Sequence, residues 1–280
     1  MKILGIESSC DETAAAVVED GHKIISSVVA TQIPFHEAYK GVVPEIASRK
    51  HTEWILPVVK TALQEAGETL QSIDGIAVTN RPGLMGSLLV GLTFAKTLAW
   101  ACNKPFIAVN HMLGHLYAAH LEQDIPYPYL GLLVSGGHSL ICKVYDFDSI
   151  EVLGITIDDA PGEAFDKVAK FYDFGYPGGV IIDRLAKNGD PKAANFPMPV
   201  LHESGRRYDV SYSGLKTAVI NQIDQFWNPG YEKTPENIAA AFQSRAVKIL
   251  LRSLLRAVED TGLHTIVAGG GVAANSLLRE

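Results

Sequence analysis

The chain has 280 residues, of which 47% are hydrophobic and 20% are charged, and its formal net charge at pH 7 is −7. This composition indicates a globular protein with a sizeable core, built as one large or two medium lobes. It argues against a secretory leader, because Glu7, Asp11 and Glu12 interrupt the start of the chain. It also argues against a membrane span, because no window approaches the roughly 20 apolar residues that a span needs.

The charge and the cysteines also bear on partners and compartment. Because affinity for RNA comes mainly from Lys and Arg, an acidic chain would need a local basic patch or a partner to bind it. The three cysteines, Cys10, Cys102 and Cys142, form no CxxC pair, which argues against a disulfide framework and a thiolate zinc site. We therefore expect a cytoplasmic protein without membrane association.

The first half of the chain is predicted to open with three short antiparallel strands. These strands are the apolar runs at residues 3–9, 14–20 and 22–30. Tight polar turns separate them, and the second turn contains Asp20 and Gly21.

A helix-covered sheet is predicted to follow. A helix is expected from Pro44 to Ala66, restarted at Pro57 and ended by Gly67. The next segments have strand, helix and strand character, at residues 75–79, 87–103 and 106–110. Strands flanked by helices indicate an α/β sheet.

The second half repeats this plan. Hairpin strands, helices and a last strand are predicted at residues 129–146, 149–160, 162–174, 178–189, 237–262 and 264–271. This weak repeat predicts a duplicated α/β architecture with two lobes, residues 1–125 and 126–280, and a cleft between them. Because residues 277–280 look like the start of an uncapped helix, we expect a chain truncated at its C-terminus.

The turn in GIESSCDETAAAVV joins two strands and carries two carboxylates. Its small polar residues could offer hydroxyl and backbone N–H groups to a phosphate. Asp11 or Glu12 could orient a metal, a water molecule or an attacking amine. An ordinary polar hairpin turn is the alternative interpretation.

Two glycine-rich segments suggest contact with a ligand. In LLVSGGHSLI, Ser135, Gly136 and Gly137 interrupt a hairpin and could point N–H groups at an anion, although a Gly-Gly hairpin turn is the plain alternative. In IVAGGGVAANSLLRE, a strand leads through three glycines into a helix start. This segment lacks the GxGxxG spacing, and we interpret it as a turn that holds a nucleotide rather than as close packing alone.

The segment NHMLGHLYAAH contains histidines at helical spacing. His111 and His115 lie four residues apart, so on a helix they share one face and could bind one metal, whereas His120 would point elsewhere. Two polar residues near a lobe interface are the alternative. The HExxH pattern of zinc peptidases is absent, because Met112 stands where its general base would be.

The order of the motifs along the chain is more specific than any one of them. The segments are IESSCDETAAAVV, TNRPGLMGSLLVGLTFAKTLA, NHMLGH, LVSGGHS, GEAFDKVAK, YPGG, SYSGLKTA and GGGVAANSLLR. Over essentially the whole chain they resemble the TsaD (Gcp) family, threonylcarbamoyl transferases once labelled O-sialoglycoprotein endopeptidases. The resemblance implies an α/β fold of two lobes, the duplicated actin-like ATPase (ribonuclease H-like) fold with an interlobe cleft.

The resemblance also implies a set of site residues. His111 and His115 match the family's histidine ligands of a divalent metal, usually iron (Fe²⁺), with zinc as an alternative; the third ligand, an Asp, lies beyond the part of the family that this chain covers. The substrate threonylcarbamoyl-adenylate would contact the residues of the LVSGG segment, Leu133, Val134, Ser135, Gly136 and Gly137. Further contacts to it, or to an adenine nucleotide in the cleft, fall on Asp166, Gly179, Asp183 and Asn275.

The implied reaction transfers the threonylcarbamoyl group to the N6 amine of the adenosine immediately 3′ of the anticodon, in tRNAs that read codons beginning with A. Asp11 or Glu12 would accept a proton from the amine or position it. The implied partners are tRNA, a paralogous actin-fold subunit, a P-loop ATPase and a separate adenylate-forming synthase. Candidates for binding tRNA phosphates are Arg49, Lys50, Arg206, Arg207 and Lys216, each of which could equally be solvated surface charge.

Two other functions stay open. A small-molecule kinase of the same fold would have similar phosphate loops but no use for the histidine pair. A non-catalytic scaffold subunit of the same complex would not be expected to keep NHMLGH and EAFDK intact.

Overall fold

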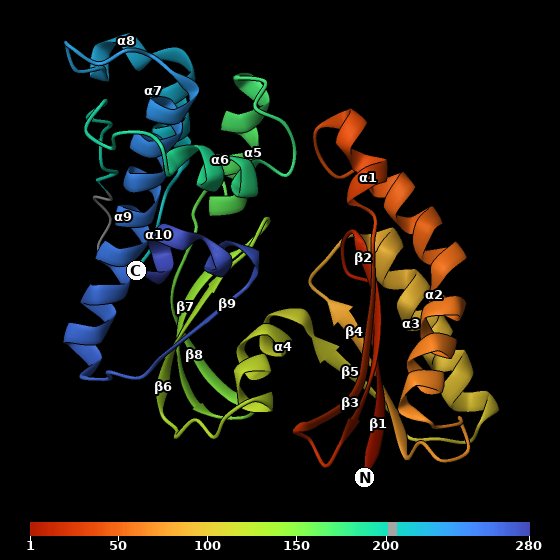
Figure 1. The fold of residues 1–280 in the computed structure, drawn as a ribbon. Helices are drawn as coiled ribbons and strands as arrows, with labels where there is room; N and C mark the ends of the chain where they lie inside the picture. Colours follow the sequence, from red (N-terminus) through yellow and green to blue (C-terminus); the bar gives the residue numbers. More distant parts are fainter. Residues whose placement is uncertain (201–205) are drawn as a thin grey trace. The chain divides into compact units, whose positions relative to one another are not determined.

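The computed structural model describes residues 1–200 and 206–280, which form two compact units, Met1–Ile125 and Pro126–Glu280. Each unit contains one sheet with its own helices and its own hydrophobic core (Figure 1). In the described residues, no helix has both the length and the apolar character that a membrane crossing requires.

The first unit is built on a five-stranded sheet in the order β3-β2-β1-β4-β5. Its strands are β1 (Lys2–Glu7), β2 (Glu12–Glu19), β3 (Lys23–Thr31), β4 (Gly75–Arg81) and β5 (Phe106–Asn110). The first three are antiparallel, as predicted, and the turn between β2 and β3 has positive φ at both Asp20 and Gly21, which suits a tight hairpin. Strands β4 and β5 run parallel to β1, so the carboxyl ends of these three strands meet at one edge of the sheet.

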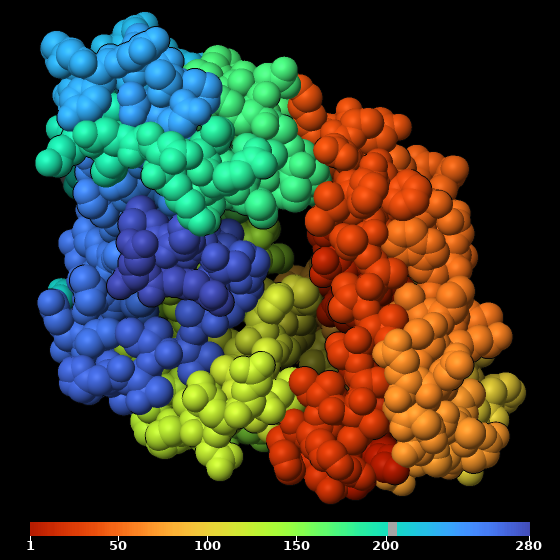
Figure 2. All heavy atoms as spheres, viewed as in Figure 1, coloured from red at the N-terminus to blue at the C-terminus, as the bar shows by residue number. Residues whose placement is uncertain are grey.

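Helices α2 (Pro44–Ala66) and α3 (Met85–Ala101) cover one face of this sheet (Figure 1). Alternate strand residues such as Leu4, Ile6 and Val78 turn toward them and are buried in the core. In Figure 2 the orange atoms of α2 occupy one flank of the first unit and the red atoms of the first strands lie beside them. The smaller elements are α1 (Ile33–His36), η1 (Glu37–Tyr39), α4 (His111–Tyr117) and η2 (Ala118–Leu121).

The prediction that Pro57 restarts the second helix is wrong. Helix α2 runs without interruption from Pro44 to Ala66 with Pro57 inside it, although its start at Pro44 and its end at Gly67, with φ 66°, are as predicted. Proline removes one backbone donor, but burial of residues on both sides of it, including Ile55 and Val58, keeps the helix packed on the sheet.

The second unit repeats the connectivity of the first. Its sheet has the order β8-β7-β6-β9, with β6 (Tyr129–Val134), β7 (Ser139–Asp146), β8 (Ser149–Ile155) and β9 (Ile266–Gly269). As in the first unit, three antiparallel strands come first and the fourth strand pairs in parallel with the first of them. The predicted duplication is therefore confirmed at the level of sheet topology.

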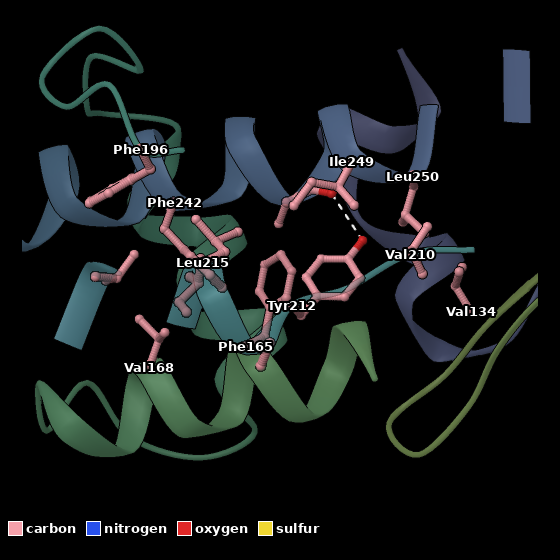
Figure 3. Close-up of a cluster of buried hydrophobic side chains, with 14 of the residues drawn as sticks. Val134, Phe165, Val168, Phe196, Val210, Tyr212, Leu215, Phe242, Ile249 and Leu250 are labelled. Atoms are coloured by element: carbon pink, nitrogen blue, oxygen red, sulfur yellow. Dashed lines mark hydrogen bonds between the residues drawn. The ribbon is translucent and has the colours of Figure 1, made fainter. Parts of the chain in front are cut away.

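Helices pack around the central helix α9 (Pro235–Thr261) to form the core of this unit. They are α5 (Pro161–Phe171), α6 (Gly178–Ala186), α7 (Ser213–Asn221), α8 (Ile223–Phe226), η3 (Gly271–Ala274) and α10 (Ser276–Arg279). Figure 3 shows Phe165, Tyr212 and Phe242 meeting in this core, where the buried Tyr212 hydroxyl donates to the carbonyl of Ala246. Helix α9 ends at Gly262 with φ 68°, as predicted.

Candidate functional site

The carboxyl ends of three parallel strands carry polar side chains in the first unit. Glu7 ends β1, Thr79 lies near the end of β4, and His111 follows β5 directly as the first residue of α4. The side chain of Asn110 caps α4 by accepting a hydrogen bond from the backbone N–H of Met112. Parallel strands thus bring together residues that are about a hundred positions apart in the chain.

His111 and His115 aim their Nε2 atoms at each other. The two nitrogens are 2.9 Å apart, the ring centroids are 4.4 Å apart and the ring planes are almost perpendicular, at 87°. Two imidazoles bound about 2.1 Å from one ion at a right angle would hold their nitrogens about 3 Å apart. The pair therefore fits a single metal ion. His120 instead lies in η2 and stacks on Tyr117.

The described residues contain no group of three or more His, Cys, Asp and Glu side chains placed to hold a metal. The histidine pair thus supplies two ligands. Burial and the neighbouring His111 lower the pKa of His115, which favours the neutral imidazole that binds metals.

Glu7 contacts His111 on the side of the ring away from His115. Its Oε2 is 3.2 Å from His111 Nδ1 and accepts a hydrogen bond from the Thr79 hydroxyl at 2.6 Å. Burial acts to raise the pKa of Glu7, but hydrogen bonds from His111, Ser9 and Thr79 outweigh it and lower the pKa to about 2. The carboxyl group of Glu7 is therefore ionised at neutral pH.

The loop that carries the predicted catalytic carboxylates is held by α2 and α3. His51 of α2 is fully buried, and its Nε2 lies 3.0 Å from the Cys10 carbonyl, which can only accept. Its Nδ1 must then accept from the Thr13 hydroxyl, 2.8 Å away. Ser87 of α3 contributes a second contact to the Cys10 carbonyl at 3.4 Å, and the Ser8 hydroxyl donates to the Ser87 carbonyl.

Close glycine contacts tighten the same loop. A Cβ on Gly83 would lie 2.8 Å from Cβ of Ser9, and one on Gly91 would overlap the Ser8 hydroxyl. The backbone N–H of Leu84 donates to the Ser9 carbonyl at 2.8 Å. A larger residue at Gly83 would have to move the backbone of the loop, and one at Gly91 would displace the Ser8 side chain from its hydrogen bond.

Asp11 and Glu12 lie at the end of this loop, where it is accessible to solvent. Asp11 is half-buried, and its carbonyl accepts from the Gln32 N–H; Glu12 is exposed at the start of β2. Partial desolvation, and the negative charges of Asp11 and Glu7, raise the pKa of Glu12. A hollow of about 230 Å³ is lined by Glu7 and Thr79 together with alanines and other residues of the first sheet.

Replacing His51 with Leu is expected to destabilise the protein by about 1–3 kcal/mol, because the buried Thr13 hydroxyl would lose its partner and the Cys10 carbonyl would lose one of its two. Urea denaturation would measure this. His51→Gln, which keeps an N–H donor, is the control and should lose less; equal losses would contradict the role of the hydrogen bonds. Burial lowers the pKa of His51 below its ordinary value of 6.5. The stabilisation that His51 gives the folded state should therefore be complete above pH 6.5 and should decline as the pH falls below it.

In the second unit, the glycine loop after β6 is exposed at its tip. Gly136 and Gly137 are exposed, and the N–H of Ser135 donates to the carbonyl of His138 to close the turn. Leu133 and Val134 are fully buried in β6. Ser135, Gly136 and Gly137 therefore form the accessible part of the LVSGG segment, and Leu133 and Val134 belong to the buried strand.

Two glycines from distant segments support this loop. A Cβ on Gly162, at the start of α5, would lie 2.7 Å from Cα of Gly136, and the Gly162 N–H donates to the Ser135 carbonyl. Gly270, after β9, has φ +89°, and a Cβ there would overlap the carbonyl of Val134. The loop is thus clasped between α5 and the β9–η3 turn.

Asp166 joins α5 to α6. Its Oδ1 accepts the backbone N–H of Gly178 at 2.8 Å, and a Cβ on Gly178 would lie 2.7 Å from Cα of Asp166. The neighbouring Gly179 has open space on its Cβ side. Gly178 therefore serves helix packing, whereas Gly179 leaves room for a ligand.

Asp183 and Asn275 are linked through Ser276. Asp183 of α6 accepts from the Ser276 N–H at 3.1 Å and from its hydroxyl at 2.8 Å. Asn275 caps α10 by accepting from the Leu278 N–H, and it donates to the side chain of Gln243 of α9. Figure 2 shows the dark-blue atoms of the α10 region at the surface of the second unit.

Comparison with known proteins identifies the family. Residues 23–280 match the family described as "TsaD: tRNA N6-adenosine threonylcarbamoyltransferase". A protein of that name from Treponema denticola is 84% identical over all 280 residues, which span 83% of its length. One from Treponema pallidum is 68% identical over the whole chain and 80% of its own length. The chain belongs to the TsaD family.

Solved structures agree on the fold of this TsaD-family chain. Full-length HypF matches 99% of the chain and 49% of its own length, with a TM-score of 0.62 and 12% identity. Component A of the (R)-2-hydroxyglutaryl-CoA dehydratase of Acidaminococcus fermentans matches all of the chain and 86% of its own length, with a TM-score of 0.57 and 13% identity. The predicted actin-like fold is confirmed, and the interlobe cleft stays a prediction.

Most basic residues predicted to contact tRNA have acidic neighbours. Arg49 pairs with Glu45 and Lys50 with Glu53 on the exposed side of α2. Arg207 pairs with Asp260, and Lys216 Nζ lies 2.5 Å from Asp159 and is mostly buried. Lys216 therefore helps to fix α7 within the second unit, which leaves it less suited to binding phosphate than Arg49, whose side chain is 75% exposed.

Several residues of this TsaD-family site carry no sequence signal of their own. Glu7 follows an apolar strand, His51 looks like one more polar residue in a polar stretch of its helix, and Gly162 looks like an ordinary helix-start glycine. Their importance comes from contacts across the fold. The segment with Gly270 was interpreted as a turn that holds a nucleotide, and the structure adds to it the close approach of Gly270 to the Val134 carbonyl.

Proposed function

We propose that this chain transfers the threonylcarbamoyl group from threonylcarbamoyl-adenylate to the N6 amine of the adenosine immediately 3′ of the anticodon and releases AMP. Relatives with this name that are up to 84% identical over the whole chain support the proposal. The observation that carries the chemistry is the convergence of the His111 and His115 Nε2 atoms at 2.9 Å. A kinase of the same fold has no use for such a pair.

His111 and His115 would hold the divalent ion, Fe²⁺ in the first instance and zinc as the alternative. When bound there, the ion supplies Lewis-acid stabilisation of negative charge in the transition state. The lowered pKa of His115, which favours its neutral imidazole, and the contact of His111 Nδ1 with Glu7, which leaves Nε2 facing His115, suit both residues to this role.

Residues of the second unit would bind the adenylate. Ser135, Gly136 and Gly137 present the exposed tip of a clasped loop, which can direct backbone N–H groups to the phosphate. Gly179 leaves room for the ligand next to Asp166. The leaving group is AMP, so holding its phosphate in place stabilises the charge that develops on it.

Asp183 and Asn275 complete the proposed adenylate site. In the structure Asp183 accepts two hydrogen bonds from Ser276, and the side chain of Asn275 is held by Gln243 and Leu278. These bonds fix the positions of both side chains before any ligand arrives. Leu133 and Val134 would support the loop from the buried strand.

Glu12 is the better candidate for the base that takes the proton from the attacking amine. A raised pKa brings a carboxylate closer to the range in which general bases act. We expect Glu12→Gln to lower kcat about 10²- to 10⁴-fold, and the acid limb of the pH–rate profile to lie above the ordinary pKa of a Glu side chain.

The comparison is with Asp11→Asn, measured under the same conditions as Glu12→Gln. A larger loss for Asp11→Asn, with the acid limb unchanged in Glu12→Gln, would assign the base to Asp11. Similar small losses in both variants would leave the carboxylates only a positioning role.

The proposed setting is the cytoplasm, with tRNA as the acceptor substrate. A paralogous actin-fold subunit, a P-loop ATPase and an adenylate-forming synthase are the proposed partners. The net charge of −7 favours shared binding of tRNA with such partners over binding by this chain alone.

The test is transfer of labelled threonine to unmodified tRNA with bicarbonate, ATP, the adenylate-forming synthase and the partner subunits. The 84%-identical Treponema denticola relative serves as the positive control. Labelled threonylcarbamoyladenosine formed only when this chain or the relative is present would support the proposal. An active relative and an inactive chain would contradict it and favour the scaffold function.

A further inference from the structure

Glu7 makes contacts on three sides at the edge of the first sheet. Its Oε1 accepts the backbone N–H of Ser9, and its Oε2 accepts the Thr79 hydroxyl at 2.6 Å and lies 3.2 Å from His111 Nδ1. These groups come from the loop between β1 and β2, from β4 and from α4, so the carboxylate joins three parts of the unit. Both of its oxygens have fixed partners.

The contact sets the tautomer of His111. Both oxygens of Glu7 act as acceptors, for the Ser9 N–H and the Thr79 hydroxyl, so the remaining contact of Oε2 is satisfied when the proton of His111 resides on Nδ1; the Ser9 hydroxyl lies 3.1 Å from the same nitrogen. The Nε2 atom of His111 then carries a lone pair. That atom is the one that faces His115 Nε2 at 2.9 Å.

The position of Glu7 is itself constrained. Glu7 is the last residue of β1, and Thr79 lies on the parallel strand β4 beside it. The Ser9 N–H that binds Oε1 belongs to the loop clamped by His51, Ser87 and the two glycines. A carboxylate placed in this way can hold an imidazole ring in one orientation.

We propose that Glu7 is a positioning residue for His111, which it holds in the Nδ1–H tautomer with Nε2 aimed at the metal position. The proposal rests on the metal-ligand role of His111 under the proposed function. Carboxylates that orient a metal-bound histidine typically raise metal affinity 10- to 100-fold. Glu7 itself stays out of the ligand set, because its contact is with the nitrogen on the far side of the ring.

The first test measures the binding of Fe²⁺ and of Zn²⁺ to the purified chain. Glu7→Gln, which keeps the size of the side chain and removes the charge, is expected to weaken binding about 10- to 100-fold. Glu19→Gln, at the far end of β2, is the matched control and should bind as the unaltered chain does. An affinity unchanged in Glu7→Gln would overturn the proposal.

His111→Ala separates this proposal from the metal-ligand role itself. If His111→Ala binds the ion as tightly as the unaltered chain, the metal assignment of the proposed function fails. If His111→Ala loses the ion and Glu7→Gln does not, only the positioning role of Glu7 fails.

The second test needs neither metal nor activity. Nitrogen-15 NMR of the histidines in the unaltered, metal-free chain should show His111 with its proton on Nδ1, and Glu7→Gln should lower the population of that tautomer. His111 protonated mainly on Nε2 in the unaltered chain would overturn the proposal, whatever the variants do.

Discussion

Replacing His111 and His115 together with Ala should abolish threonylcarbamoyl transfer and leave the fold intact. Their Nε2 atoms are 2.9 Å apart on neighbouring turns of α4, and the double replacement removes both of these nitrogens from the proposed metal site. A metal acting as a Lewis acid contributes several kcal/mol to the stabilisation of the transition state. Because 1.36 kcal/mol corresponds to a factor of ten in rate, we expect a loss of about 10³-fold or more.

The measurement is the tRNA transfer assay, run beside circular dichroism and urea denaturation. Without the two imidazoles, Glu7 still has the Thr79 hydroxyl and the Ser9 N–H, so little change in stability is expected. His120→Ala is the matched control, since this histidine stacks on Tyr117 instead of joining the pair. Full activity in the double variant would refute the metal-ligand role.

Gly270→Ala should disturb the Ser135–Gly137 loop of the second unit more than any other replacement of a nearby glycine by alanine. Gly270 has φ +89°, a region that residues with a Cβ rarely adopt. The added Cβ would overlap the Val134 carbonyl oxygen and lie 2.8 Å from the Val134 carbonyl carbon. Strain of this kind costs about 1–3 kcal/mol, to which the displacement of β6 from β9 would add.

Gly271→Ala is the control for this prediction, because the next glycine along the chain has open space on its Cβ side. Urea denaturation should show a loss of stability in Gly270→Ala and little in Gly271→Ala. Binding of an adenine nucleotide, measured by calorimetry, should weaken in Gly270→Ala if the loop holds the phosphate. Equal stability and affinity in the two variants would show that the loop does not depend on this contact.

Most of the fold could be predicted from local patterns. Two patterns are strong signals: the alternating apolar residues of β1 to β3 and the long amphipathic pattern of α9. Each pattern indicates which face of the element is buried. Helix α7 (Ser213–Asn221) was not predicted, because it is short and because the hydrogen-bond acceptor for the N–H groups at its start comes from a distant part of the chain. Asp158, more than 50 residues earlier, accepts the backbone N–H groups of Tyr212 and Ser213.

The candidate site was predictable only where its residues are close in the chain. His111 and His115 follow from helical spacing, and the glycine segments mark places where the backbone can approach a ligand. The partners of these residues could not be predicted. Glu7 meets His111 across 104 positions, and His51 meets Cys10 across 41, so only the pairing of strands and helices reveals these contacts.

The glycine contacts have a thermodynamic consequence for substrate binding. Gly162 and Gly270 clasp the Ser135–Gly137 loop within the second unit, so its shape is set when the protein folds. Ordering one residue costs about 1–2 kcal/mol of backbone entropy, so a disordered loop of three residues would subtract about 3–6 kcal/mol from the binding free energy of a ligand. Here that penalty falls on folding, so the affinity for the adenylate that we propose as the ligand should be limited by its contacts and not by disorder in the loop.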